Sequence, residues 1–327
     1  GSLMNPLYTY ESEMDTPLYR FIKPTDSNFL NDFCRYNMIG ETRQLNDYER
    51  AKSSGSFATL SKGLTHYKLS GPSDGKVVVL IHGIVGPFGI WKKVADSLLS
   101  QGYRVIQYDL YGRGYSDRPD VNYDLDLFIN QLSELFEVLS IRNTIYLVGW
   151  SLGGMIAVGY TAKYSDKIEK LILIAPAGVG LSRPLNARIA MIPFLGEMLM
   201  GLFGRQIIIR SISKELHGSE HINEFRDLVT EQMQYQGYLR AFLSTLRCCA
   251  FEDATEDFRT IGKLGLSVLM ISGSEDSIIK PSARRRICEL IPHLQYSEVL
   301  DTGHMPTFER PTEVSRILND FISSGSE

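Results

Sequence analysis

The segment Gly149-Trp150-Ser151-Leu152-Gly153 constrains how this chain can fold. Residues 144–148, just before it, form a short apolar run rich in β-branched side chains, which predicts a buried strand. Residues 155–163, just after it, are rich in helix formers. A serine between a strand and a helix, with a glycine two residues away on each side, is typical of a strained turn that presents the hydroxyl group at a sheet edge. We therefore expect a nucleophilic serine at position 151.

Strand and helix patterns alternate on both sides of this turn. Continuous apolar runs at residues 76–81 and 104–109 predict strands that are covered on both faces, and apolar residues at helical spacing follow them. The same alternation returns near the end of the chain, with strands at 267–272 and 296–300. Strands that alternate with helices predict an α/β fold with a doubly wound, mostly parallel sheet.

One long insertion interrupts the alternation. From about residue 179 to 258 the chain carries many apolar residues without a strand period, which predicts a helical cap on the sheet. We therefore expect an α/β core from residues 56–178 and 259–327, and an N-terminal arm over residues 1–55. We expect this arm to pack on the core rather than to bind a partner or a membrane. Its apolar residues are Phe29, Leu30, Phe33, Tyr36 and Met38.

Composition limits the classes of function. The chain has 327 residues and a net charge of −4, which gives no reason to expect a nucleic-acid partner. Its four cysteines lack the spacing of metal ligands, and two of them, Cys248 and Cys249, are adjacent, so we expect free thiols in a reducing compartment. No apolar run reaches transmembrane length, and no signal peptide is visible. These features favour a cytoplasmic location.

Polar side chains follow several of the other predicted strands. Because the carboxyl ends of parallel strands meet at one edge of a sheet, we expect Asp276 and His304 to lie near Ser151. A serine hydroxyl needs a base to remove its proton, and the base needs an acid that fixes its tautomer. His304 is the predicted base and Asp276 the predicted acid. Glu275 is the alternative acid, and His82 is the alternative base.

Five motifs in this order resemble the α/β-hydrolase superfamily, over residues from about 57 to 323. The resemblance implies that Ser151 is the nucleophile, His304 the base and Asp276 the acid, with no metal ion or cofactor. It also implies an oxyanion hole formed by the backbone N–H groups of Ile84 and Leu152. The motifs are His82-Gly83, Asp109-x-x-Gly112-x-Gly114-x-Ser116, Gly149-Trp150-Ser151-Leu152-Gly153-Gly154, Gly273-x-x-Asp276 and Gly303-His304-x-Pro306.

The chemistry expected from this resemblance is ester hydrolysis. Members that open epoxides or remove halides carry a carboxylate at the turn, so the serine favours acyl transfer. The methionines and leucines of the cap indicate an apolar acyl pocket and contact with a membrane surface, whereas no specific protein partner is inferred. We expect a serine esterase or lipase of lipid metabolism that cleaves medium-chain esters or monoacylglycerols. The residues expected to line the pocket are Trp150, Met191, Phe194, Met198, Phe203 and Met305.

Other functions remain compatible with the same residues. A related family with the same triad and a similar cap hydrolyses a carbon–carbon bond in vinylogous diketones. Another, which also carries Gly-Trp-Ser-Leu-Gly-Gly, cleaves methyl esters of carrier-bound acyl chains, and the arginines of the cap suit an acidic carrier. Some members of the superfamily act as ligand receptors or interaction proteins. Turnover of simple esters distinguishes the enzymes from the receptors.

Overall fold

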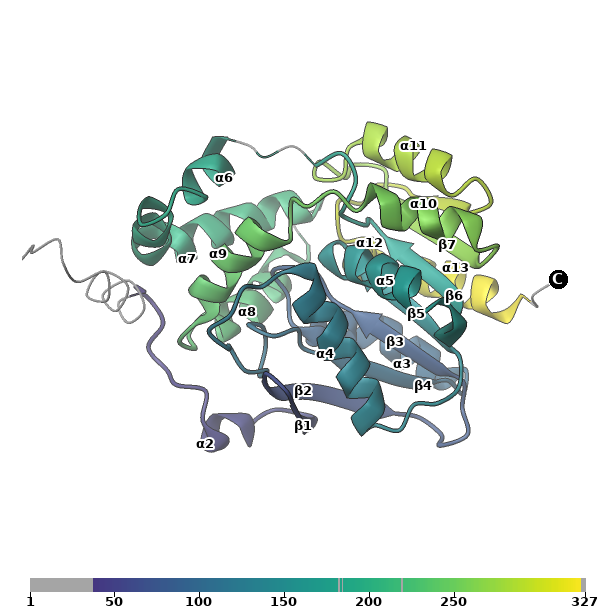
Figure 1. Ribbon diagram of the computed structural model, residues 1–327, viewed down its shortest axis with the longest axis horizontal. Coiled ribbons are helices and arrows are strands. Elements are labelled where there is room, and N and C mark those ends of the chain that lie inside the picture. Colours follow the sequence, from purple (N-terminus) through teal and green to yellow (C-terminus); the bar gives the residue numbers. More distant parts are fainter. Residues whose placement is uncertain (1–37, 182, 184, 219, 325–327) are drawn as a thin grey trace, which may run out of the picture.

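A single eight-stranded sheet organises the computed structural model, which describes residues 38–181, 183, 185–218 and 220–324 (Figure 1). The strand order is β1-β2-β4-β3-β5-β6-β7-β8. Strand β2 pairs antiparallel with β1 and β4, and all the other neighbouring strands pair in parallel. The strands are β1 (Ser56–Leu60), β2 (Gly63–Ser70), β3 (Val77–Ile81), β4 (Arg104–Tyr108), β5 (Ile145–Trp150), β6 (Ile168–Ile174), β7 (Ser267–Gly273) and β8 (Gln295–Val299).

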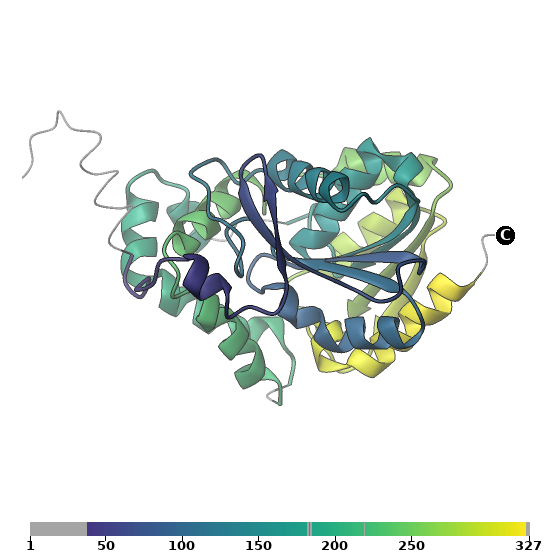
Figure 2. The same cartoon turned by 90° about the horizontal axis from the view of Figure 1, so that it is seen from below.

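Helices cover both faces of the sheet, as Figure 2 shows. One face packs against α4 (Leu125–Val138), α5 (Leu152–Lys163), α10 (Thr255–Lys263) and α11 (Pro281–Leu290). The other packs against α3 (Lys92–Ser100) and α13 (Pro311–Ser323). All residues of the central strands β3 and β5 are buried, which explains their continuous apolar runs. The prediction of a doubly wound, mostly parallel sheet is confirmed.

Four helices between β6 and β7 form the cap at one end of the sheet (Figure 1). They are α6 (Leu185–Ala190), α7 (Leu195–Glu215), α8 (Ile222–Gln232) and α9 (Tyr238–Cys248). Helix α10 begins within the expected cap range, but it packs against α5 and α11 on the sheet. Short helices complete the chain, namely α2 (Asp47–Arg50), η2 (Phe88–Trp91), η3 (Ser165–Lys167) and α12 (Pro306–Glu309).

The described part of the N-terminal arm lies against the cap. The backbone N–H of Ile39 donates to the carbonyl of Gly201 in α7, and Arg43 exchanges backbone hydrogen bonds with Gln234 and Gln236. Met38 is buried in the apolar cluster that joins the cap to the sheet. The apolar residues Phe29, Leu30, Phe33 and Tyr36 lie outside the described residues. Residues 38–43 therefore connect the arm to the cap.

Helix α7 is apolar on both its buried and its exposed sides. The buried side repeats every four residues, whereas several large apolar side chains face solvent. Within the described ranges, no helix has the length and apolarity needed to span a bilayer. The buried residues of α7 include Gly196, Met200, Gly204, Ile208 and Ile212, and the exposed apolar ones include Met198, Leu202, Phe203 and Ile207.

Candidate active site

Ser151 lies at the sharp turn between β5 and α5. Its backbone has φ 54° and ψ −116°, a strained conformation for a residue with a side chain. The flanking glycines are required by close packing, because a Cβ atom on Gly149 would lie 2.2 Å from the carbonyl oxygen of Gly153. A Cβ atom on Gly153 would lie 2.3 Å from the carbonyl oxygen of Ile81. The tight turn directs Ser151 away from the sheet and towards His304.

His304 and Asp276 join Ser151 in one hydrogen-bonded chain. The Ser151 Oγ atom is 2.9 Å from His304 Nε2, and His304 Nδ1 is 2.9 Å from Asp276 Oδ2. The second carboxylate oxygen of Asp276 accepts backbone N–H bonds from Ile278 and Ile279. This arrangement assigns the proton on His304 to Nδ1 and leaves Nε2 free to accept the serine proton.

The structure distinguishes the two adjacent acids. The Asp276 side chain is fully buried against His304, whereas Glu275 is exposed. Burial by itself would raise the pKa of Asp276, but the charge and hydrogen bond of His304 outweigh it and lower the pKa. Burial likewise opposes the charged form of His304, yet Asp276 raises the pKa of that histidine above its ordinary value. The pair therefore favours an ionised aspartate that stabilises a protonated histidine.

Ile84 and Leu152 carry the two backbone N–H groups predicted to form the oxyanion hole. Leu152 is the first residue of α5, so its N–H has no acceptor within the helix and lies at the positive end of the helix dipole. Ile84 lies in the loop after β3, where its carbonyl oxygen accepts a hydrogen bond of 2.8 Å from Arg113 Nε. Among the described residues, neither amide N–H donates to a protein acceptor. The oxyanion hole itself stays a prediction.

His82 supports this loop as a neutral side chain. Its Nδ1 donates to the carbonyl of Gly83, and its Nε2 accepts from the backbone N–H of Leu110. Burial lowers the pKa of His82 to about 4. Since both ring nitrogens are already occupied, the structure disfavours His82 as the alternative base.

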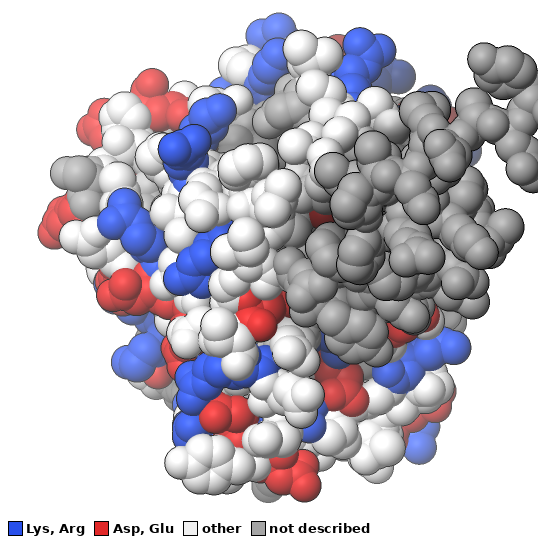
Figure 3. All heavy atoms as spheres, turned by 90° about the vertical axis from the view of Figure 1, so that its left-hand side faces the viewer, with Lys and Arg blue, Asp and Glu red and all other residues white. Residues whose placement is uncertain are grey.

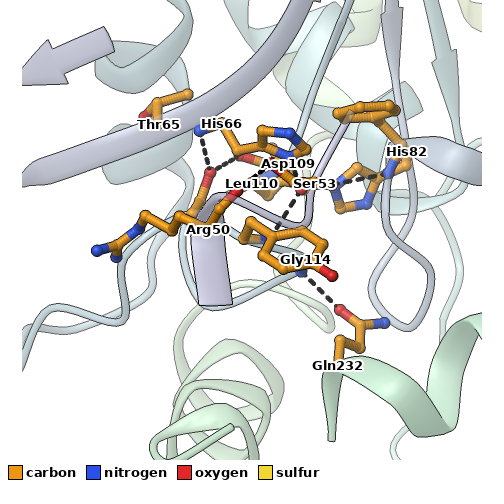
Figure 4. Close-up of polar contacts among 12 residues, drawn as sticks. Arg50, Ser53, Thr65, His66, His82, Asp109, Leu110, Gly114 and Gln232 are labelled. Atoms are coloured by element: carbon orange, nitrogen blue, oxygen red, sulfur yellow. Dashed lines mark hydrogen bonds and ion pairs between the residues drawn. The ribbon is translucent and has the colours of Figure 1, made fainter. Parts of the chain in front are cut away.

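His66 and Asp109 form a second buried histidine–aspartate pair, shown in Figure 4. The His66 Nδ1 atom is 2.7 Å from Asp109 Oδ2, and the same carboxylate accepts backbone N–H bonds from Phe88 and Tyr115. The sequence shows no identifiable partner for His66 and therefore predicts a solvated side chain, and that prediction is wrong. The imidazole is buried because the antiparallel pairing of β2 with β4 brings it beside the strand end that carries Asp109.

Residues of the cap also form hydrogen bonds with the loop that follows β3, residues 82–87, which we call the oxyanion loop. Gln232, at the end of α8, donates from Nε2 to the carbonyl of Val85 at 2.5 Å and accepts from the N–H of Gly114 at 2.7 Å. Figure 4 shows Gln232 pointing towards Gly114. Tyr238 at the start of α9 donates to the same Val85 carbonyl. The position of the loop thus depends on cap residues that the sequence motifs do not include.

Three of the predicted pocket residues lie on α7 or directly before it and are exposed. Phe194, Met198 and Phe203 are about half exposed, at 55%, 49% and 52%, on the outer side of the cap. The helix period explains the difference, because the buried positions of α7 are those in register with Met200 and not with Met198. Met191 is half-buried between α6 and α7, and its contact with substrate stays a prediction.

Trp150 and Met305 also differ from the prediction. Both side chains are completely enclosed in the apolar cluster and present no surface to a substrate. Trp150 Nε1 donates a hydrogen bond of 2.8 Å to the carbonyl oxygen of His304, and its ring packs against the imidazole. These residues therefore support the position of His304 and do not line a pocket.

Two surface cavities, of about 650 and 570 Å³, are lined by residues other than Ser151 and His304.

Two acidic residues near His304 are absent from the predicted site. Glu309 accepts backbone N–H bonds from Gly303, His217 and Gly218, so it joins the histidine loop to the end of the cap helix α7. Glu215, the last residue of α7, places Oε2 4.0 Å from His304 Nε2. Neither follows a recognisable motif, because each contact joins segments that are distant in the sequence. Among the described residues no cluster of His, Cys, Asp and Glu suits a metal ion.

Comparisons with known proteins agree with this fold. A family model described as alpha/beta hydrolase fold matches residues 76–311. The chain is 27% identical over 298 residues to Lipase 3 of Moraxella sp. (strain TA144), covering 86% of this chain and 89% of that protein. It is similar in structure to an esterase from Exiguobacterium antarcticum, with a TM-score of 0.71 and 20% identity over 83% of this chain and 100% of that one. A meta-cleavage product hydrolase from Pseudomonas fluorescens gives a TM-score of 0.68 and 24% identity, covering 82% and 97%.

Proposed function

The chain belongs to the α/β-hydrolase family and is an ester-cleaving hydrolase, and from this premise we propose that it transfers acyl groups to water through Ser151, His304 and Asp276. The observation that carries the proposal is the hydrogen-bonded chain from the Ser151 hydroxyl through His304 to Asp276. Its geometry meets the requirement that nucleophile, base and orienting acid lie within hydrogen-bond reach of one another.

The proposed reaction has two halves. His304 Nε2 removes the Ser151 proton as the oxygen attacks the ester carbonyl, and the N–H groups of Ile84 and Leu152 stabilise the oxyanion. Loss of one such donor typically costs about 3–4 kcal/mol of transition-state stabilisation. The protonated His304 then gives its proton to the leaving alcohol. Water, deprotonated by His304, cleaves the acyl-serine in the same way, and the scheme needs no metal ion or cofactor.

We propose apolar, lipid-like esters as the substrate class. Support comes from Ile84 and Leu181, half-buried apolar side chains that pack against both core clusters and offer partly exposed apolar surface to an acyl chain. The lipase relative points in the same direction. A series of p-nitrophenyl esters from acetate to decanoate tests this class, because each buried CH₂ contributes about 0.8 kcal/mol. A profile that falls from butyrate to decanoate would contradict it.

A second candidate is carbon–carbon bond hydrolysis of a vinylogous diketone. It is favoured by the likeness to the meta-cleavage product hydrolase and by the deep burial of His304, which is 1% exposed. Such an enzyme should turn over a dienoic diketone faster than any simple ester. A ligand-binding role is tested by the same panel, since a receptor without catalytic activity hydrolyses none of the esters. The methyl ester of a carrier-bound acyl chain is a further alternative substrate.

We also propose that the exposed side of α7 contacts a lipid surface. Its exposed apolar side chains include Met198 and Phe203, and exposed basic residues occur on α6 and in the second half of α7. Figure 3, which views the cap end of the molecule, shows basic side chains among uncharged ones. Anionic vesicles should therefore retain the wild type more than zwitterionic ones do. Met198→Glu should weaken that retention, and Gln206→Glu on the same helix is the matched control. The basic residues are Arg188, Arg210 and Lys214.

A further inference from the structure

Glu215 is a buried carboxyl group that faces the reacting side of His304. The side chain belongs to the last residue of α7, and its Oε2 atom lies 4.0 Å from His304 Nε2, the same nitrogen that bonds Ser151. The backbone fixes this position, because the N–H of His304 donates to the carbonyl oxygen of Glu215 at 2.8 Å. The cap therefore presents a carboxyl group at the point where acyl transfer would occur.

The protein provides little compensation for burying this group. Glu215 is only 8% exposed, and within the described part of the chain its carboxyl group has no hydrogen bond or ion pair apart from the long contact with His304. Burial raises the pKa of Glu215; His304 opposes this effect, and Asp276 adds to it. Buried polar groups in proteins are nearly always hydrogen-bonded, so a carboxyl group without a hydrogen-bond donor beside a nucleophile indicates a donor that arrives with the substrate.

The position of Glu215 corresponds to the leaving group of an ester. During acyl transfer the departing alcohol oxygen must lie within hydrogen-bond reach of His304 Nε2, because that nitrogen supplies its proton. A carboxyl oxygen 4.0 Å from the same nitrogen is then beside the carbon atoms that carry the departing oxygen. A hydroxyl group on the adjacent carbon can donate to Glu215 without displacing the ester.

We propose that Glu215 is a specificity-determining residue that accepts a hydrogen bond from a hydroxyl group next to the ester oxygen, so that esters of glycerol and other vicinal diols are preferred over simple alkyl esters. This inference rests on the proposed acyl transfer through Ser151. It narrows the substrate class to partial glycerides and related diol esters. An alkyl ester leaves the buried carboxyl group without a donor, which lowers its rate.

The test uses two esters of nearly the same shape, 2-hydroxyethyl hexanoate and propyl hexanoate. The wild type should hydrolyse the hydroxyethyl ester with a kcat/KM about tenfold higher, the effect of one hydrogen bond to a charged group. In Glu215→Met, which keeps the length of the side chain, the ratio of the two kcat/KM values should fall to near one. Glu215→Gln keeps one acceptor oxygen and should give an intermediate ratio. Glu224→Gln, at an exposed acid of α8, is the matched control and should keep the wild-type ratio.

Each other outcome overturns a defined part of the argument. Equal kcat/KM values for the two esters in the wild type would refute the role of Glu215 while leaving ester hydrolysis intact. A Met or Gln variant that lowers both values equally would show that Glu215 acts only through His304 or through folding. A wild type that hydrolyses neither ester and resists a fluorophosphonate would refute the proposed function, and this inference with it.

Discussion

The molecule contains two buried histidine–aspartate pairs with nearly the same local geometry. Asp276 lies 2.9 Å from Nδ1 of His304, and Asp109 lies 2.7 Å from Nδ1 of His66. Each aspartate also accepts two backbone N–H bonds. Burial alone would raise the pKa of both carboxyl groups, but in each case the histidine and the hydrogen bonds lower it. The two pairs therefore share the same contacts of the aspartate and of histidine Nδ1.

They differ at the second ring nitrogen. Nε2 of His304 is 2.9 Å from the Ser151 hydroxyl and 4.0 Å from Glu215 Oε2. Nε2 of His66 is buried without a partner among the described residues, and the ring lies between Phe57 and Phe88. A histidine acts as a base only where a reacting group reaches its free nitrogen. The comparison therefore assigns chemistry to one pair and a structural role to the other.

The largest expected effect is the loss of activity on replacing Ser151, compared with replacing Ser116, the serine beside the second pair. Ser151→Ala should lower kcat/KM by about 10⁵-fold or more, because no other group can form the acyl intermediate. The adduct with a fluorophosphonate should disappear as well. Ser116→Ala is the control, since this buried serine bonds only backbone groups beside the second pair. Mass spectrometry should find the adduct on Ser116→Ala, and an adduct on Ser151→Ala would place the nucleophile elsewhere.

Replacing the two aspartates should affect different properties. Asp276→Asn should lower kcat by about 10⁴-fold, since the amide favours the wrong tautomer of His304. Asp109→Asn should lower kcat per labelled active site by less than about tenfold. Its main effect should be a loss of about 3 kcal/mol in the free energy of unfolding, because it removes one charge of a buried pair. Denaturant titration and active-site labelling measure the two quantities, and a collapse of kcat in Asp109→Asn would contradict the comparison.

The catalytic pair could be predicted from the sequence because local patterns carry it. Runs of β-branched residues predict the strands, and the glycines around Ser151 mark a turn in which a Cβ atom would collide with backbone. Parallel pairing then brings the ends of β5 and β7 to one edge of the sheet. From these rules an acid at residue 275 or 276 is expected near Ser151, and the resemblance to the family then favours Asp276.

The structural pair and the cap depend on tertiary contacts that no local pattern reports. His66 is buried because β2 packs beside the loop of Asp109. Helix α7 is apolar on several sides, so its sequence does not reveal that Met200 is buried and Met198 faces solvent. Glu215 meets His304 across 89 residues of chain, since the C-terminal end of α7 rests on the histidine loop.

A smaller effect on kcat is expected from replacing Gln232, the cap residue that bonds the loop after β3. Gln232 bonds Val85 in the oxyanion loop and Gly114 in the loop that follows Asp109. Gln232→Leu should therefore lower kcat by about tenfold through a misplaced Ile84 N–H, with little change in KM. Stopped-flow acylation with a p-nitrophenyl ester measures the step directly. Glu231→Gln, the neighbouring exposed residue, is the control. An equal loss in both variants would indicate a general effect on α8.

The smallest expected effect is a shift in the pH profile of kcat/KM. It tests whether that profile depends on His304 and not on His66. His304 must be neutral to accept the serine proton, and its pKa is raised above the ordinary value of about 6.5. The kcat/KM should therefore fall as the pH decreases through that raised value. Asp276 faces one ring nitrogen of His304 and Glu215 the other, and both carboxylates favour the charged imidazolium. Glu215→Gln removes one of these charges, so the acid limb of the profile should move to lower pH.

His66→Gln supplies the matched comparison for this profile. It changes the second buried pair, whose Nε2 faces no reacting group, so the acid limb should stay where it is in the wild type. Profiles of kcat/KM between pH 4.5 and 9 with a neutral ester, whose own charge is constant, measure both variants. If the limb moved in His66→Gln and stayed fixed in Glu215→Gln, the acid limb would belong to the other pair. The separation between a catalytic and a structural histidine would then have to be abandoned.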